Sequence, residues 1–423
     1  MVSRNELFLT LCALSFLEVF AQTFCAHYIS KDIAAIMYLI TGIVIGVVPL
    51  LKVEVTPRTI IAAKSNSKVV YVLFSLLAIS LLLVGMQKVS DQPLDYTFAD
   101  MLPVIKIMGE RWISGKDVYA LIPEIWDGMK PVYLPVMWMS YVPPLFFGLD
   151  IRVTNLMILI GVTALILRIF DRPRNHHYVS LVILLPLLLL FSYIFLTYST
   201  FITISEEPVV VGFYCLLVYA VMRSKPWLII IALAGCLLSR YTLAFWAVIY
   251  LVYGYFVINH RRYLSIAIGT GVLCALLLVI SQGIYKVDLF LSLKDAYVTS
   301  ITDPAREWSA VNTMTKNIGL ARFVAYENLI YLHTALVWGS LLLPLGLFTL
   351  YHFVLKKWVH FALFAACSLK LCLVYFFNVN PLPYSYLFYT STFLSLIIIS
   401  QYRTEIIEQK DDLSTKSFLP TMR

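Results

Sequence analysis

The chain has 423 residues, of which 61% are apolar and 13% are charged, and its mean hydropathy is +0.85. This composition excludes an ordinary soluble domain, in which about 25% of the residues are charged. The net charge of +8 does not indicate nucleic-acid binding. The basic residues cluster in short connections between apolar segments, as they do in the cytoplasmic loops of membrane proteins.

Apolar segments of roughly 17–20 residues recur along the chain and are long enough to cross a bilayer. They must be helical there, because lipid offers no partners to open backbone groups. The sequence therefore predicts an all-α polytopic membrane protein with about 12–13 transmembrane helices. The clear spans lie near residues 7–24, 33–51, 69–87, 153–170, 178–197, 208–222, 227–240, 242–258, 331–351, 361–377 and 385–401, with one more before residue 282.

Charge bias predicts the topology. The basic connections are expected in the cytoplasm; they are residues 52–68, 168–177, 223–225, 259–262 and 356–357. Both termini then lie inside, and residues 402–423 form a charged cytoplasmic tail. Residues 88–131 become a first external loop and residues 282–330 a second. Because long loops tend to be functional or structured, we expect interfacial helices in both, with the second loop closing over the first.

One apolar segment is difficult to reconcile with this topology. Residues 133–149 are apolar enough to enter the membrane, and a full span there would invert every later connection. Pro135, Pro143 and Pro144 interrupt any helix. We therefore favour a re-entrant or interfacial element; a thirteenth span, or a half-span missed elsewhere in the chain, are the alternatives.

The sequence shows no motif for metal, nucleotide or disulfide chemistry. The seven cysteines lie in or beside apolar segments without metal-ligand spacing, so we interpret them as small buried hydrophobic residues. The sequence contains no P-loop, no nucleotide-type glycine-rich turn and no HExxH motif. We expect no metal and no soluble cofactor. The first span has no convincing processing site and is expected to remain as an anchor.

Two carboxylates follow the third span and are expected near the membrane surface. Asp100 begins the segment DMLPVIKIMGERW, where it has the signature of a helix N-cap. A carboxylate in this place can also take a proton from a hydroxyl acceptor. Asp100 is our first candidate for such a base, and Asp95 is the alternative. The helix is expected to lie amphipathically in the interface, with Lys106, Glu110 and Arg111 on its polar face.

A second candidate group lies at the ends of two later spans. Glu206 and Glu207 precede an apolar span, where acids serve either as helix caps or in function. Arg240 ends the next span. Its guanidinium can hold a phosphate through a bidentate fork; alternatively it extends to the membrane surface or pairs with Glu206 or Glu207.

The first external loop and the segment after it also contain a glycine and two tyrosines that are candidate site residues. Gly115 is interpreted as a helix stop, and Tyr119 and Tyr133 can donate hydrogen bonds at the interface. Structural roles are the default for these residues. The pattern Asp100, Gly115, Tyr119, followed by Tyr133 and Pro135 at re-entry, resembles the polytopic GT-C-type glycosyltransferases.

The resemblance covers roughly residues 95–152, with weaker support from the spans through about residue 262. It includes the alpha-mannosyltransferase-like and protein mannosyltransferase-like branches, and bacterial members of unassigned substrate are the most similar. Two features depart from the family: two extra spans precede the loop, and Asp95 and Asp100 are not an adjacent pair.

The resemblance implies an enzyme that uses a polyprenyl-phosphate sugar in the bacterial inner membrane, with its site on the external face. Asp100, with Asp95 in reserve, would be the base. Arg240 would hold the donor phosphate, and Glu206, Glu207, Tyr119 and Tyr133 would bind substrate. A glycan, lipid or protein would accept the sugar, with inversion.

Two alternatives stay open. One is a transporter or flippase of lipid-linked saccharides, and the other is a polysaccharide polymerase or ligase. The transporter would be expected to carry ionisable residues and broken helices near mid-membrane. Charged residues concentrate instead in loops at one surface, which favours the enzyme.

Overall fold

The structure is a computed structural model that describes residues 4–51, 67–97, 99–125, 128–167, 182–288, 290, 298, 318–381 and 386–416. The regular elements in this part of the chain are all helices, and it contains no β-strand, only one isolated antiparallel bridge between Ile122 and Met129. Leucine, isoleucine and valine dominate the helices, as the apolar composition predicts. The prediction of an all-α protein is confirmed for the described residues, and the long apolar helices are compatible with a membrane protein.

Six helical segments in the described part are long and apolar enough to cross a membrane; they are Glu6–Ile29, Lys31–Leu50, Phe74–Asp91, His260–Ile280, Tyr326–Phe353 and Phe361–Val379. They correspond to α1 (Arg4–Phe20) with a π-helical continuation (Ala21–Ile29), α2 (Lys31–Val47) with a 3-10 turn (Val48–Leu50), α3 (Ser67–Asp91), α14 (His260–Ile280), α17 (Leu329–Phe353) and α18 (Phe361–Val379).

The other apolar helices are shorter or extend beyond their apolar part. They are α7 (Val153–Leu167), α9 (Leu184–Leu196), α11 (Glu207–Met222), α12 (Pro226–Ser239), α13 (Ala244–Tyr253) with a π-helical end (Gly254–Ile258), and α19 (Leu387–Lys416). Helix α19 runs past the expected span, so the part of the charged tail up to residue 416 is a helical continuation and not a separate segment.

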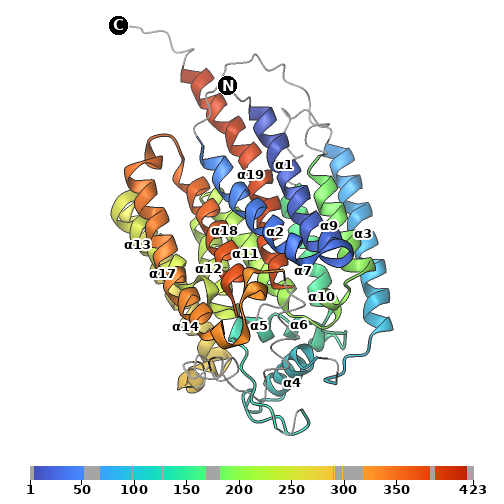
Figure 1. Cartoon of the computed structure of the whole chain (residues 1–423). Helices are drawn as coiled ribbons and strands as arrows, with labels where there is room; N and C mark the ends of the chain where they lie inside the picture. The colour runs from blue at the N-terminus through green and yellow to red at the C-terminus, as the bar shows by residue number, and fades with distance from the viewer. Residues whose placement is uncertain are drawn as a thin grey trace.

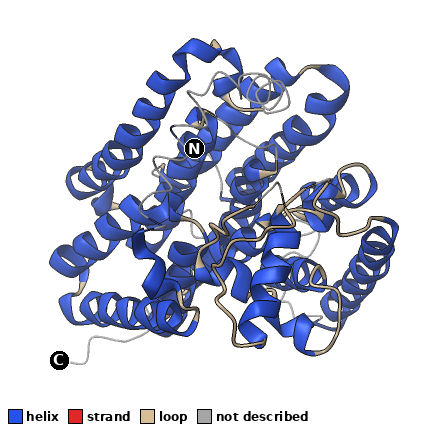
Figure 2. Ribbon diagram, turned by 90° about the horizontal axis from the view of Figure 1, so that it is seen from below, coloured by secondary structure: helices blue, strands red, loops and turns tan. Residues whose placement is uncertain are grey.

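The helices run up and down through one bundle (Figure 1). The start of α1 and the far end of α19 lie at the same end, as the topology predicts for termini on one side. The short helices α4 (Met101–Ile113), α5 (Pro135–Met139), α6 (Val142–Phe146) and α10 (Thr200–Thr203) gather at the opposite end. Seen from that end, loops run across the helix ends (Figure 2). Two groups of connections are thus separated by the length of the bundle.

The core lies along α11, α18 and α19. Helix α11 packs against α7, α12, α18 and α19, and α18 also packs against α2 and α17. Most side chains of α11 and α18 are buried, whereas α3, α14 and α17 expose many leucine, isoleucine and valine side chains. An apolar outer surface is the one expected to face lipid.

Residues 133–149 do not form a continuous helix. They contain α5 and α6, which have five residues each and are broken at Ser140 and Tyr141. A span needs about 20 residues at a rise of 1.5 Å each, so neither helix crosses a bilayer. The structure agrees with the non-spanning element that the prolines predict.

The first loop packs on the start of the second. Trp112 of α4 donates to the Ile280 carbonyl at 2.9 Å, and Lys286 forms an ion pair with Asp117 at 3.2 Å. The Gln282 amide bonds the backbone of Lys116 and Val118. The described part of the second loop holds 3-10 turns (Gly283–Lys286, Leu320–Phe323 and Tyr326–Asn328). Most of residues 289–317, where surface helices were expected, lie outside the described residues.

Candidate functional site

An arginine and two glutamates meet where α11 begins and α12 ends. The two helices are joined by residues 223–225, so they pack antiparallel and their far ends come together. Arg240 Nη2 lies 2.9 Å from Glu207 Oε2 and 3.3 Å from Glu206 Oε1. Both glutamates are buried, and the Arg240 side chain is 21% exposed. The approach of these three residues was one of the alternatives that the sequence left open.

Helix α19 supplies the next side chains of the group. Thr390 donates to Glu207 Oε1 at 2.7 Å. Tyr386, just before α19, lies near the Arg240 charge and donates to the Met101 sulfur at 3.3 Å. Met101 is the first residue of α4, so Tyr386 connects the arginine to the start of this helix.

A buried amide holds the backbone before α11. Asn155 Nδ2 of α7 donates to the Ile202 and Ser205 carbonyls, each at 3.0 Å. Its Oδ1 accepts from the Tyr141 hydroxyl at 2.7 Å. Tyr141 also lies close enough to Glu206 and Glu207 for their charges to act on it. These contacts hold the two glutamates at a fixed place relative to α5 and α6.

Asp100 occupies the N-cap position of α4, but its side chain forms no cap hydrogen bond. Its backbone is already helical (φ −83°, ψ −19°), whereas a capping residue normally has extended backbone that turns its oxygen onto the next turn. The expected cap is therefore absent. Asp100 lies close enough to Glu206 for their negative charges to interact. Partial burial raises the pKa of the Asp100 carboxyl above its ordinary value.

The rest of α4 follows its predicted amphipathic pattern. Ile105 and Met108 are buried, and Lys106 and Glu110 form an exposed ion pair at 3.8 Å. Arg111 departs from the prediction, because its guanidinium donates to the Ala120 and Leu121 carbonyls. The arginine thus holds the following loop instead of lining the surface.

Asp95 has a local role. Its Oδ1 accepts from the Thr97 backbone N–H at 2.9 Å, which is an Asx turn. The Ala99 N–H bonds the Asp95 carbonyl at 3.4 Å. These bonds form the turn that leads into α4.

Tyr119 and Tyr133 meet each other. The Tyr119 hydroxyl donates to the Tyr133 carbonyl at 3.3 Å and accepts from Trp138 Nε1 at 3.2 Å. Burial raises the pKa of Tyr119 to about 12. Gly115 ends α4 with a positive φ of 67°, as expected of a helix stop. Tyr119 thus ties the first loop to α5, which agrees with the structural role taken as its default.

The group holds more negative than positive charge. Glu206 and Glu207 share the guanidinium of Arg240, and Asp100 lies near Glu206. Glu206 Oε2 is buried and has no hydrogen-bond partner among the described residues. Because buried polar atoms are almost always paired, this oxygen calls for a donor such as water or a substrate hydroxyl.

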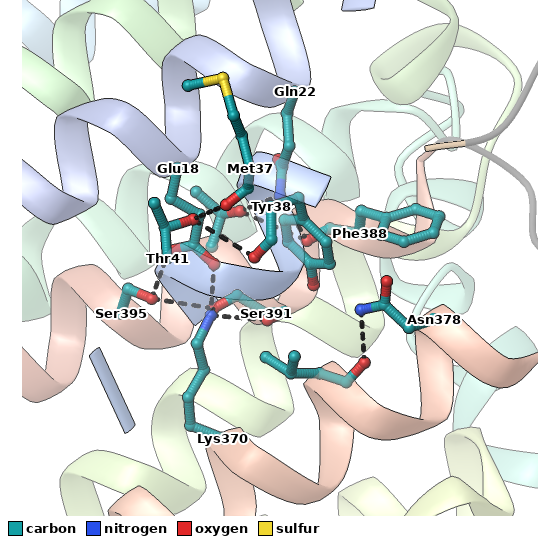
Figure 3. A network of polar contacts seen from close by, with 12 residues as sticks. Glu18, Gln22, Met37, Tyr38, Thr41, Lys370, Asn378, Phe388, Ser391 and Ser395 are labelled. Atoms are coloured by element: carbon teal, nitrogen blue, oxygen red, sulfur yellow. Dashed lines mark hydrogen bonds and ion pairs between the residues drawn. The ribbon is translucent and has the colours of Figure 1, made fainter. Parts of the chain in front are cut away.

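A second ionisable pair, which the sequence interpretation missed, lies deep in the bundle (Figure 3). Lys370 Nζ of α18 lies 2.5 Å from Glu18 Oε1 of α1, and both side chains are fully buried. The ammonium also donates to the Ser391 carbonyl at 2.8 Å and to Ser391 Oγ at 2.6 Å. Ser395 Oγ donates to Glu18 Oε2 at 2.6 Å.

This pair corrects the view that charge lies only at one surface and in loops. Each residue is a single charge within an apolar segment, a signal that marks functional candidates in membrane helices. The two were missed because each span is apolar on average. Helix α1 also turns π-helical at Ala21, three residues after Glu18, and such π segments are frequent at functional sites.

No family model, no curated protein and no solved structure matches the chain. Among the described residues, no group of three or more histidine, cysteine, aspartate or glutamate side chains is arranged to hold a metal ion. The site is therefore interpreted from its own geometry.

Proposed function

We propose that the protein is a membrane glycosyltransferase of the GT-C type that moves a sugar from a polyprenyl phosphate to a hydroxyl acceptor. The observation that carries this proposal is Asp100. Its carboxylate lies at the start of an interfacial helix, forms no cap bond, and lies beside the Glu206–Glu207–Arg240 group. The six long and six shorter apolar helices among the described residues are compatible with the predicted 12–13 spans.

In this mechanism, Asp100 removes the proton of the acceptor hydroxyl as its oxygen attacks the anomeric carbon of the sugar. The bond between that carbon and the phosphate oxygen breaks, and the polyprenyl phosphate leaves with the bonding electrons, so the configuration inverts. A carboxyl with a raised pKa is a stronger base than an ordinary aspartate. An amphipathic α4 holds it at the depth where a lipid-linked donor presents its phosphate.

The neighbouring residues have separate tasks in this proposal. Both ion pairs of Arg240 use Nη2, so in this proposal Nη1 donates to a phosphate oxygen of the donor. Glu206 Oε2 accepts from a hydroxyl of the sugar or the acceptor. Tyr119 and Tyr133 shape the loop around the acceptor. Charge bias in the connections favours the external face of the bacterial inner membrane for this end of the bundle.

The decisive test is consumption of a donor. Purified protein is incubated with a panel of radiolabelled polyprenyl-phosphate sugars, and release of polyprenyl phosphate is followed with and without simple hydroxyl acceptors. One donor is expected to be consumed by the wild type and not by Asp100→Asn. If no donor is consumed, or if Asp100→Asn consumes it at the wild-type rate, the proposal fails.

Arg240 variants test the phosphate-binding role separately. Arg240→Lys keeps the charge but loses the planar fork, so donor affinity is expected to fall by about 10-fold, and further in Arg240→Ala. Donor binding and thermal stability are measured on the same samples. If Arg240 only neutralises Glu206 and Glu207, stability falls and donor affinity is unchanged.

The buried Glu18–Lys370 pair favours a second candidate, a transporter or flippase of lipid-linked saccharides. Ionisable residues deep in a bundle often mark translocation pathways. The two functions separate in proteoliposomes that contain a fluorescent lipid-linked sugar. A flippase exposes the inner-leaflet pool to an external quencher without any chemical change, whereas the transferase releases polyprenyl phosphate.

A further inference from the structure

A small cavity lies at the end of the bundle opposite α4, where α11 ends and where α14 and α18 begin. Its volume is about 100 Å³. Its lining combines cationic, hydroxyl and apolar side chains; the residues are Val221, Ser224, Ile258, Arg262, Tyr263, His360, Phe361 and Ala362. None of these lining residues is acidic, so the cavity is suited to an anion.

Arg262 supplies the charge. Its Nε is buried and has no hydrogen-bond partner among the described residues. The residue itself is well anchored, because its backbone N–H donates to Asn259 Oδ1 at 3.0 Å in the cap of α14. Its guanidinium carbon lies 5.9 Å from the centre of the Tyr263 ring. A guanidinium with an unused buried donor can form charge-assisted hydrogen bonds to an oxyanion.

His360 supplies a second donor. It is the N-cap of α18, and its Nδ1 accepts from the Ala362 N–H at 3.4 Å. Nε2 therefore carries the proton of the neutral ring and remains a donor. The N-terminus of α18 adds the positive end of the helix dipole. Burial and the nearby Arg262 charge hold the pKa of His360 below its ordinary value, and an anion between the two groups would relieve that repulsion.

The surroundings are basic and apolar together. Arg261, Lys356 and Lys357 are exposed near the cavity, and so are the apolar side chains of Ile258 and Phe256. Basic pockets between membrane helices that open beside an apolar surface fit the head groups of anionic phospholipids. The chemistry shared by such a head group and free phosphate is a tetrahedral oxyanion.

We propose that this cavity is a binding site for a phosphate group, with Arg262, His360 and Ser224 as its donors, and that an anionic phospholipid is the source of the phosphate. This site is separate from the Asp100 group and lies at the other end of the bundle. The proposal of this phosphate site does not depend on the proposed glycosyltransferase activity.

The test measures binding of two probes to the purified full-length protein in neutral detergent. One probe is radiolabelled short-chain phosphatidic acid, and the other is radiolabelled inorganic phosphate; phosphatidylcholine competes as the neutral lipid. Saturable phosphatidic acid binding that phosphatidylcholine does not displace supports the lipid source. Equal saturable binding of inorganic phosphate supports the site and assigns it to free phosphate.

Matched variants decide whether the cavity is responsible. Arg262→Gln is expected to weaken binding by about 10- to 100-fold, as for the loss of charge-assisted hydrogen bonds, while Arg261→Gln, one residue away and exposed, changes it less than about 3-fold. Arg262→Lys, which keeps the charge and removes the fork, is expected to lose about 10-fold and serves if the glutamine variant does not fold. No saturable binding in the wild type, or equal losses at positions 261 and 262, would overturn the proposal.

Discussion

Replacing Asp100 with asparagine is expected to lower turnover by roughly 10²–10⁴-fold, the range for losing a general base. The amide has nearly the same shape, and the carboxylate makes no cap hydrogen bond that the amide would break. Expression, thermal stability and donor affinity are therefore expected to stay near the wild type. Steady-state release of polyprenyl phosphate gives the rate, and donor binding is measured separately.

Asp95→Asn is the matched control, because it changes the same chemical group five positions earlier, where the carboxylate forms only a turn. It is expected to keep most of the activity. The pH profile gives a second readout. The base acts when ionised, so kcat/KM falls as the pH drops through the pKa of Asp100. Because that pKa is raised, the fall is expected above the ordinary aspartate value of about 3.9. An inactive Asp95→Asn beside an active Asp100→Asn would assign the base to Asp95.

Lys370→Met is expected to lower the free energy of unfolding by about 3–5 kcal/mol, because it leaves the Glu18 carboxylate buried without its partner. The hydroxyl of Ser395 remains on that carboxylate, but one neutral donor does not replace an ammonium. Denaturant titration in detergent micelles, followed by tryptophan fluorescence, measures the loss.

The double variant Glu18→Gln with Lys370→Met separates the charge from the packing. Removing both charges is expected to recover most of the lost stability, since a buried pair is often no better than apolar residues of similar volume. Lys106→Met, which breaks the exposed Lys106–Glu110 pair, is the control and is expected to cost less than about 0.5 kcal/mol. A double variant as unstable as Lys370→Met alone would show that packing, not charge, sets the loss.

Sequence patterns predicted much of the fold because lipid imposes strong rules on a chain. The spans around α2, α7, α11, α12 and α18 begin within a few residues of their expected positions, because a long apolar segment crosses a bilayer as a helix. The break at 133–149 followed from three prolines. The continuation of α19 to Lys416 was not predicted, because a charged helix looks like a solvated tail in sequence.

The sequence predicted several residues of the candidate site, but few of the contacts between them. The meeting of Arg240 with Glu206 and Glu207 follows from a short connection between two antiparallel helices, which is local information. Thr390, Tyr386 and Asn155 were not foreseen, because they come from distant parts of the chain. No single-sequence pattern indicates which buried hydroxyl or amide faces a given carboxylate. The same holds for Glu18 and Lys370, whose partnership spans 352 positions.

That separation has a consequence for how the protein is made. Glu18 enters the membrane with the first helix, while Lys370 and Ser395 are synthesised near the end of the chain. A lone charged residue at the bilayer centre costs about 2.5–3.5 kcal/mol on insertion scales. Until α18 and α19 are inserted, the carboxylate of Glu18 therefore lacks the two side chains that pair with it in the folded structure. Chains that stop before α18 lack both partners of Glu18 and are therefore expected to be less stable in the membrane than the full chain.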